Sequence, residues 1–343
     1  MPPELPPTNF LDPYFFTVHV VMLFMLGACF GSFFNVCIYR IPMNVPLSLP
    51  PSHCYRCGRF IRWYDNIPLI SYWVLGGKCR HCGASFSIRY FCVELLTALL
   101  FLAAFLKLGY TLALLPALVF LSLLIIATFT DIDHWIIPDR VSLGGMAAGL
   151  VLAAIPPVAW ARGNPLAVHL FPVAEPLAPL ANAAVGAAVG YGGLWLVGKL
   201  GTLLFRKDAM GVGDMKLMAM FGAFLGPEPL LHVLILACLV GTAAGLAGLA
   251  RARLTRDRVV DPATAPLALS GEEVDALLAR MPLDAAEARV VDAALRKPGV
   301  LGPVRHHLPF GPSLAVAAAI VYFYFPQLRA LLERLVLPGP LVP

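Results

Sequence analysis

Long apolar runs constrain the fold of this chain more than any other feature. Residues 14–37, 90–108 and 112–130 are each long enough to cross a bilayer. Such a run must satisfy its own backbone polar groups in lipid, which a helix does. Further apolar runs cover 141–158, 180–205, 217–226, 230–250 and 310–325, of which 217–226 is short for a full span. The chain is 59% hydrophobic and 13% charged, against roughly 25% charge in soluble domains. The sequence therefore predicts an all-α polytopic membrane protein with about eight transmembrane helices.

The distribution of basic residues predicts how these helices are oriented. With eight spans, twenty of the twenty-five Lys and Arg residues fall on the side that holds 41–89, 131–140, 206–216 and 251–304, when Arg40 and Arg305 at its borders are included. Because cytoplasmic loops of membrane proteins collect Lys and Arg, we expect this side to face the cytoplasm and both termini to lie outside. The N-terminus has no basic region before its first apolar run, so we expect no cleavable signal peptide.

Shifts in composition divide the chain into five expected parts. Two polar stretches interrupt the apolar pattern, one after the first run and one before the last. We expect a first transmembrane helix over 1–40, a small cytoplasmic domain over 41–89, a membrane core over 90–250, a cytoplasmic helical insertion over 251–304, and a last helix with a short tail over 305–343.

The first polar stretch contains two CxxC pairs. Cys54 and Cys57 form one pair, and Cys79 and Cys82 form the other, with 21 residues between the pairs. Two such pairs can surround one ion with four thiolates, the arrangement of a closed structural zinc site. A reducing cytoplasm argues against disulfides. The sequence favours a four-cysteine zinc site over free thiols or a redox pair, and bound zinc would stabilise a domain too small for a large core.

Two aspartates are expected at the same membrane level. Asp131 stands at the end of the third apolar run, and Asp214 follows the end of the fifth within the segment Gly211-Val212-Gly213-Asp214. Two adjacent carboxylates share a proton, so that one acts as a base on water and the other as an acid, which is aspartic-protease chemistry. The alternative is two unrelated helix caps. Asp133 competes with Asp131, but two helical steps place them on nearly opposite faces. Asp139 is expected to cap the next helix.

The residues around Asp214 are candidates for substrate contact. Gly211 and Gly213 could adopt backbone conformations closed to other residues and could let an extended substrate backbone approach closely. Lys216 could bias the pKa of Asp214 or contact the substrate.

Several motifs, in this order along the chain, resemble those of the type IV prepilin peptidases, membrane aspartic proteases of the GxGD type. The matching stretches are GSFFNVCIYRIP (31–42), CYRC (54–57), WYDNIPLISYWVLGGKCRHC (63–82), RYFCVELLTA (89–98), DIDHWIIPD (131–139), GVGDMKLMAMFGAFLG (211–226) and LPFGPSLA (308–315). The resemblance implies that Asp131, seven residues before the Pro of its motif, pairs with Asp214 as the catalytic residues. The sequence departs from the family at Tyr55, where a Pro is usual, and in the length of the 251–304 insertion.

The resemblance also implies two activities in the bacterial inner membrane. One is cleavage of the basic leader of prepilins or pseudopilins, after a glycine, at the cytoplasmic face. The other is N-methylation of the new N-terminus with S-adenosylmethionine, because larger members of the family carry the cysteine-rich region. The expected partners are these substrates, the lipid bilayer and the type IV pilus or type II secretion machinery, with no nucleic acid.

The sequence does not itself locate the S-adenosylmethionine site. Candidates are residues of the 63–75 stretch and Glu94, whose charge lies one turn inside the second span and is expensive to leave unpaired there. A structural partner for an Arg is an equally good interpretation of Glu94. The other functions considered are a peptidase that lacks methyl transfer, and a non-enzymatic transporter or assembly scaffold. Transporters place polar groups near the bilayer midplane, whereas the carboxylates here cluster at one interface.

Overall fold

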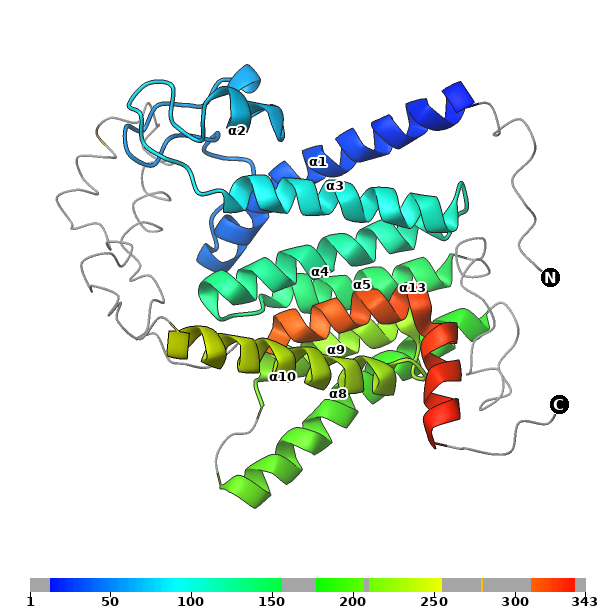
Figure 1. Cartoon of the computed structure of the whole chain (residues 1–343). Helices are drawn as coiled ribbons and strands as arrows, with labels where there is room; N and C mark the ends of the chain where they lie inside the picture. The colour runs from blue at the N-terminus through cyan, green and yellow to red at the C-terminus, as the bar shows by residue number, and fades with distance from the viewer. Residues whose placement is uncertain (1–12, 156–176, 207–209, 255–278, 280–309, 337–343) are drawn as a thin grey trace. The chain divides into compact units, whose positions relative to one another are not determined.

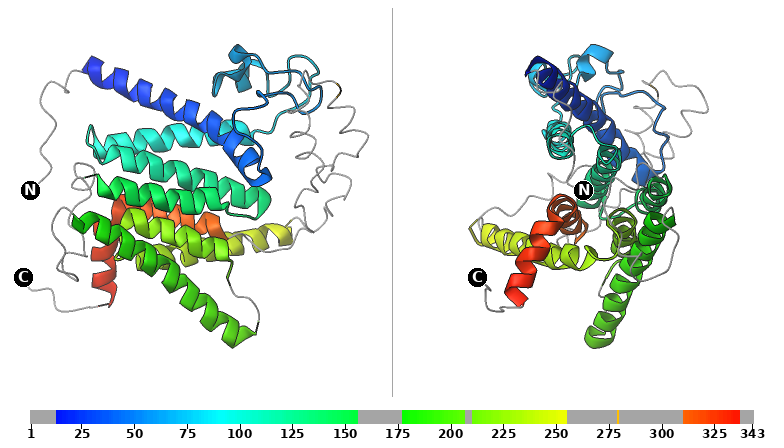
Figure 2. Two further views of the ribbon diagram at one scale, coloured as in Figure 1. Left: turned by 180° about the vertical axis from the view of Figure 1, so that it is seen from behind. Right: turned by 90° about the vertical axis from the view of Figure 1, so that its right-hand side faces the viewer.

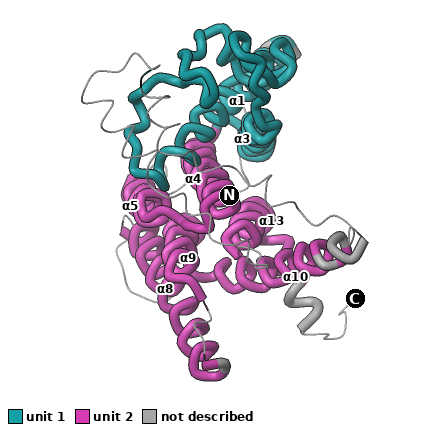
Figure 3. Tube along the Cα trace, turned by 90° about the vertical axis from the view of Figure 1, so that its left-hand side faces the viewer, with its two compact units in different colours: residues 1–110, 256–306 teal, residues 111–255, 307–343 magenta. Residues whose placement is uncertain are grey.

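The computed structural model of the chain describes residues 13–155, 177–206, 210–254, 279 and 310–336. The chain forms two compact units, residues 1–110 with 256–306 and residues 111–255 with 307–343 (Figure 3). The expected insertion 251–304 falls almost entirely outside the described residues, and its first four residues belong to helix α10 (Leu230–Leu254).

The described residues are helical apart from turns and two isolated β-bridges, which confirms the predicted all-α membrane fold. Six helices are long and apolar enough to cross a membrane, with spans at Phe16–Met43, Arg89–Leu108, Leu114–His134, Ala178–Leu204, Leu230–Gly248 and Phe310–Leu331. The other two expected spans correspond to the shorter helices α5 (Asp139–Ala154) and α9 (Val212–Leu225).

The first unit is built on two helices that pack closely along their length. Helices α1 (Pro13–Met43) and α3 (Arg89–Leu108) lie side by side (Figure 1). A Cβ added to Gly27 would lie 2.7 Å from the Cα of Ala98, and one added to Gly31 would lie 2.6 Å from the Cα of Glu94. This GxxxG pair allows the two backbones to approach each other.

The chain between α1 and α3 forms a small polar module. It contains the 3₁₀ turn η2 (Trp63–Asn66) and the short helix α2 (Ile70–Val74). Arg40, near the end of α1, donates hydrogen bonds to the carbonyl oxygens of Pro46, Leu47 and Pro50 at 3.0, 3.2 and 2.6 Å. These bonds fix the direction in which the chain leaves the helix.

The described part of the second unit contains six helices, of which α9 is the central one. It comprises α4 (Leu114–His134), α5, α8 (Ala178–Phe205), α9, α10 (Leu230–Leu254) and α13 (Phe310–Val336). Helix α9 packs against α5, α8, α10 and α13, and residues 217–224 are buried without interruption. Figure 2 shows α8 crossing the other helices of this unit obliquely. A helix that is hydrophobic on every face is expected in the interior of a bundle.

Small residues on two neighbouring helices create the space for α9. On α8, a Cβ added to Gly186 would lie 2.2 Å from the carbonyl oxygen of Gly222, and one added to Gly190 would lie 2.4 Å from that of Met218. On α5, a Cβ added to Gly145 would lie 2.4 Å from the sulfur atom of Met220. Backbone therefore packs against backbone or side chain with no room for a methyl group, which fixes the position of α9 precisely.

Helix α13 is bent near its end. Tyr324 has non-helical dihedral angles (φ −125°, ψ 17°), and Pro326 follows it. Pro removes a backbone donor and commonly bends a helix. The segment after the bend turns away from the first part in both views (Figures 1 and 2), and Arg329 forms an ion pair with Glu228 at 2.5 Å.

Candidate active site and metal centre

Asp131 lies in the last turn of α4, which runs four residues beyond the expected end of the third span. The helix stops at Trp135, which adopts a left-handed conformation (φ 57°) and donates its N–H to the Asp131 carbonyl oxygen at 2.9 Å. The Asp131 residue is 7% exposed, whereas Asp133 is only half-buried. The helix therefore turns Asp131 into the second unit and Asp133 away from it.

Asp214 lies in the first turn of α9 and not in a loop. Gly211 caps the start of this helix with an ordinary extended conformation (φ −72°, ψ 141°), and Gly213 is already helical. Neither glycine has the positive φ that would require glycine, so the expected special backbone conformation was wrong for both positions. Gly213 instead meets a neighbour, because its added Cβ would lie 3.4 Å from Ile137 Cβ.

The two carboxylates influence each other electrostatically. Asp214 lies outside the six candidate spans, and its pKa is raised to about 6, first by burial and second by the negative charge of Asp131. Neighbouring carboxylates disfavour ionising together, so the pair holds one proton at a pH where isolated aspartates have lost theirs. Such a pair has both a proton donor and a proton acceptor.

A third segment completes the surroundings of Asp131. The backbone N–H of Gly311, at the start of α13, donates a hydrogen bond to the Asp131 carboxylate. A Cβ added to Gly311 would lie 2.4 Å from Asp131 Oδ2 and 3.3 Å from Ile137 Cδ1. Gly311 belongs to the motif LPFGPSLA (308–315), and the sequence alone predicts no role for it. The Gly-Pro pair at the start of an apolar run predicts a helix start, but not its contact with Asp131.

Lys216 forms an ion pair on the surface beside this site. Its Nζ lies 2.6 Å from Oδ1 of Asp139, in the first turn of α5. The N-cap of α5 is Pro138 and no side chain caps the helix, so the expectation that Asp139 caps it was wrong.

The four predicted cysteines come together in the first unit. The sulfur atoms of Cys54, Cys57, Cys79 and Cys82 all lie within 4.8 Å of one another, and those of Cys54 and Cys82 are 3.7 Å apart. A tetrahedral zinc ion with Zn–S bonds of about 2.3 Å separates its sulfur ligands by about 3.8 Å. The four thiols therefore fit the size and chemistry of a closed zinc site, and the cluster can hold this ion.

The two halves of the cluster repeat one backbone pattern. The N–H of Cys54 donates to the Arg59 carbonyl at 3.0 Å, and the N–H of Cys79 donates to the Ala84 carbonyl at 2.8 Å, five residues ahead in each case. Gly58 and Gly83 occupy equivalent places with φ of 68° and 70°. Glycine is favoured at such angles, so the fuller motif is CxxCG, and the sequence shows this repeat at both pairs.

Tyr55, where the sequence departs from the family pattern, connects the two halves. Its hydroxyl donates a hydrogen bond to the Ser85 carbonyl at 3.0 Å, and its ring packs edge-on against Phe86. Arg80, between the cysteines of the second half, forms a two-pronged ion pair with Asp65 of η2, and its Nη2 lies 2.5 Å from Oδ1. These hydrogen bonds lower the pKa of Asp65.

Glu94 lies at the start of α3 and faces the polar module. Its Oε2 accepts a hydrogen bond from the backbone N–H of Leu69 at 2.7 Å, and the Ser32 side chain provides another. Leu69 has a positive φ of 64°, an uncommon conformation for a residue with a side chain. The described partners of Glu94 are thus a backbone amide and a hydroxyl, and not the Arg that the sequence interpretation offered as a structural partner.

Comparison with known proteins agrees with this division of the chain. The sequence model of the "Bacterial Peptidase A24 N-terminal domain" matches residues 25–108, and that of the "Type IV leader peptidase family" matches residues 118–246. No solved structure matches the chain.

Several curated relatives carry the name "Prepilin leader peptidase/N-methyltransferase". The protein of Myxococcus xanthus is 37% identical over 94% of this chain and 95% of its own length. The protein of Klebsiella pneumoniae is 40% identical over 63% of this chain and 89% of its own length. The protein of Neisseria gonorrhoeae is 34% identical over 65% of this chain and 79% of its own length.

Proposed function

Since this chain belongs to the type IV leader peptidase family, we propose that it cleaves the leader peptide of prepilins or pseudopilins and then methylates the new N-terminal amine. The name shared by the relatives pairs these two activities. The observation that carries the proposal is the pair of interacting carboxylates, Asp131 and Asp214, at the ends of α4 and α9.

The carboxylate pair supplies both proton transfers that peptide hydrolysis needs. The ionised carboxylate takes a proton from a water molecule, whose oxygen attacks the scissile carbonyl carbon, while the protonated carboxyl gives its proton to the carbonyl oxygen. The tetrahedral intermediate then collapses, the C–N bond breaks and the leaving nitrogen takes up a proton. The pair titrates as a unit, so the two roles belong to the pair together.

The substrate backbone is proposed to lie along the start of α9. Gly211 is exposed and Gly213 is half-exposed, so an extended peptide can approach this turn without meeting side chains. A substrate that also contacts Lys216 shares its ammonium group with Asp139, which already lies 2.6 Å away.

The remaining parts of the proposal concern cofactors and location. The four cysteines bind zinc, which holds the two CxxCG halves together, and methyl transfer uses S-adenosylmethionine as the methyl donor. The concentration of basic residues in 41–89, 131–140 and 206–216 supports an active site on the cytoplasmic side of the bacterial inner membrane. The product then passes to the type IV pilus or type II secretion machinery.

The cleavage proposal is tested with the Asp131→Asn and Asp214→Asn variants, purified in detergent and mixed with a prepilin. Asn keeps the shape but holds no transferable proton, so each variant is expected to lose cleavage by at least 1,000-fold on a gel that resolves precursor from product. Asp133→Asn is the matched control on the same turn and is expected to process the substrate normally. Full processing by either single variant of the pair would overturn the proposed chemistry.

A further inference from the structure

The short helix α2 in the polar module carries its large apolar side chains on the outside. Ile70, Trp73 and Val74 are 50%, 72% and 72% exposed. Because positions i, i+3 and i+4 share one face of a helix, these three side chains form a single apolar surface, which we call the α2 patch. A short helix in a polar domain is expected to turn such a face inward, so the outward patch needs a partner.

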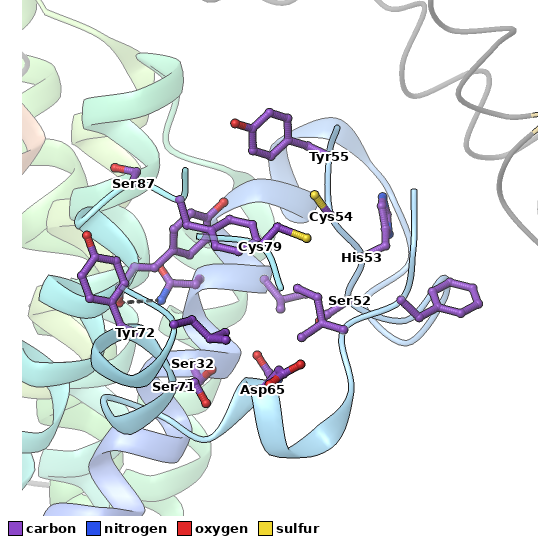
Figure 4. A pocket seen from close by; sticks show the side chains of 18 of the residues that line it. Ser32, Ser52, His53, Cys54, Tyr55, Asp65, Ser71, Tyr72, Cys79 and Ser87 are labelled. Carbon is purple, nitrogen blue, oxygen red and sulfur yellow. Dashed lines mark hydrogen bonds between the residues drawn. The ribbon is translucent and has the colours of Figure 1, made fainter. Parts of the chain in front are cut away.

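The opposite face of α2 is polar and is held against the rest of the module. Ser71 is buried, and its hydroxyl accepts a hydrogen bond from the Ile67 N–H at 2.9 Å and donates one to the Tyr64 carbonyl oxygen at 3.2 Å. Ser71 and Tyr72 also line a cavity of about 600 Å³ between the module and helices α1 and α3 (Figure 4). These contacts fix the rotation of α2 and keep its apolar face on the surface.

Phe91 places α2 at the level where the membrane-spanning part of α3 begins. Its ring centroid lies 5.6 Å from that of Tyr72 and 5.7 Å from that of Trp73. Phe91 belongs to the first turn of α3, and the candidate span of this helix starts at Arg89. Helix α2 therefore lies at the end of the first unit where α1 ends and α3 begins (Figure 1).

The α2 patch continues an apolar stripe on α3. One side of α3 packs against α1, and exposed side chains follow helical spacing on the other side at Ile88, Cys92, Leu96, Leu99 and Leu106. A membrane-spanning helix presents a stripe of this kind to acyl chains. Ile88 is 62% exposed and directly precedes the helix, so the stripe extends past the start of the span. Phe91 follows Ile88 at i+3, and its contact with Trp73 joins the stripe to the patch.

The residue types around the patch suit the headgroup region of a bilayer. Trp is enriched at membrane–water interfaces, because its ring has an apolar body and a polar N–H. Residues 44–89 contain six basic residues and one acidic residue, Asp65, which is already paired with Arg80. An excess of positive charge is attracted to anionic lipid headgroups. A lipid surface therefore fits both the apolar patch and the charge beside it.

We propose that the α2 patch is an interfacial anchor, inserted into the lipid leaflet in which α1 ends and α3 begins. Trp73 lies at the boundary between headgroups and acyl chains, and Ile70 and Val74 contact the upper part of the acyl chains. The polar module is then attached to the bilayer at a third point, in addition to its two helix connections. This contact does not depend on the proposed activities, because all of its residues lie on the surface of the first unit.

Fluorescence of Trp73 in lipid nanodiscs tests the anchor. Trp63→Phe, Trp135→Phe, Trp160→Phe and Trp195→Phe together leave Trp73 as the only tryptophan. Bromine on the lipid acyl chains quenches a ring inside the bilayer, whereas iodide in the buffer quenches a ring in water. The control protein keeps Trp195, an exposed residue of the α8 span, in place of Trp73. Brominated lipid is expected to quench the two proteins to within about twofold of each other, and iodide is expected to leave most of the Trp73 signal.

Two outcomes would overturn the anchor. Quenching of Trp73 by iodide but not by brominated lipid would place the α2 patch in water. Protection of Trp73 from both quenchers would mean that protein covers the patch, either another part of this chain or a second copy of it.

Val74 offers a matched pair of substitutions at one position. The stem of Lys in Val74→Lys can lie along the apolar layer while its ammonium group reaches anionic headgroups. The short carboxylate of Val74→Asp is repelled by the same headgroups and cannot reach past them. In nanodiscs with anionic lipid, quenching of Trp73 by brominated chains is expected to persist in Val74→Lys and to fall by at least about twofold in Val74→Asp. Equal quenching of the two proteins would contradict the insertion of this face.

A further measurement uses the wild-type protein and needs no substitution. A lipid with a photoactivatable group on its acyl chain is expected to label peptides that contain residues 70–74 as well as those that contain Leu96 and Leu99 of α3. Labelling of α3 with no label on residues 70–74 would show that the patch does not enter the bilayer.

Discussion

Gly311 is the residue on which the geometry of Asp131 depends most directly. Its N–H binds the carboxylate, and its missing side chain leaves only 2.4 Å between a would-be Cβ and Asp131 Oδ2. Real Cβ atoms do not come this close to backbone or side-chain oxygens, so any other residue must push the carboxylate aside.

We expect Gly311→Ala to lower the rate of leader cleavage by about 100-fold, the usual cost of displacing a catalytic group by roughly 1 Å. The rate is measured with a purified prepilin under single-turnover conditions. Gly144→Ala on α5, where an added Cβ meets no atom within 4 Å, is the control and should cleave at the wild-type rate. Equal rates for the two variants would mean that Gly311 does not position Asp131.

Asp214 links the chemistry to the stability of the fold. The pKa of its carboxyl is raised to about 6 in the folded protein, against about 3.9 in an unfolded chain. Its ionised form therefore opposes folding. This penalty is absent below about pH 4, grows as the pH rises, and is complete above about pH 6.

Asp214→Asn should consequently abolish cleavage and yet stabilise the protein at pH 8, by on the order of 2 kcal/mol. The difference in thermal unfolding temperature between variant and wild type, followed in one detergent, should shrink toward zero at pH 4. A variant that is less stable than the wild type at pH 8, or a difference that does not change with pH, would contradict the raised pKa.

At the scale of helices, glycine stripes decide where α9 lies. Gly186 and Gly222 touch backbone to backbone, and a Cβ added to Gly222 would lie 1.9 Å from the Gly186 carbonyl oxygen. Gly192 and Gly193 on the same helix α8 have no atom within 4 Å of an added Cβ. Helix α8 thus carries one glycine that close packing requires, Gly186, and two that it does not require, Gly192 and Gly193.

We expect Gly222→Ala to destabilise the protein by about 1–3 kcal/mol, as overpacking of a close contact does. Gly192→Ala should leave stability unchanged or raise it by up to about 1 kcal/mol, because Ala favours the helix. Thermal unfolding of both proteins in the same detergent compares them. If the two substitutions have the same effect, the close approach of α8 and α9 is not as described.

The helices were predictable because lipid imposes a simple rule, that an apolar run of sufficient length becomes a helix. That rule alone predicts where helices α1, α3, α4, α8, α10 and α13 lie along the sequence. The same rule did not predict that α9 is central, because the apolar run 217–226 indicates a short helix but not which helices pack against it. The Gly311 contact depends on two segments far apart in the chain, and no local pattern reports such a contact.

At the scale of the whole molecule, the two groups of proposed site residues lie in different units. The carboxylate pair belongs to the second unit, and the cysteine cluster belongs to the first. The first unit also contains a cavity that is lined partly by residues beside the two CxxCG turns, such as His53 and Ser85. Because the family resemblance links methyl transfer to the cysteine-rich region, loss of zinc is expected to affect methyl transfer first.

We expect Cys54→Ser to lower the zinc content of the purified protein from one ion to near zero and to abolish methyl transfer. Cleavage should be reduced less than methyl transfer. The control is Cys92→Ser, an exposed cysteine of α3 outside the cluster, which should retain the metal and both activities. Zinc content is measured by atomic emission, and an unchanged value for Cys54→Ser would exclude a site made of all four thiols.

The burial of α9 has a consequence for how this protein is assembled in the membrane. At about 1.5 Å per residue, its 14 residues reach about 21 Å, less than the roughly 30 Å of hydrocarbon that a span must cross. It meets other helices on every side, so it has no need to be stable alone in lipid. The Asp214 carboxylate at its first turn is therefore held in place by the helices that surround α9, and the proposed catalytic pair forms only when those helices have packed together.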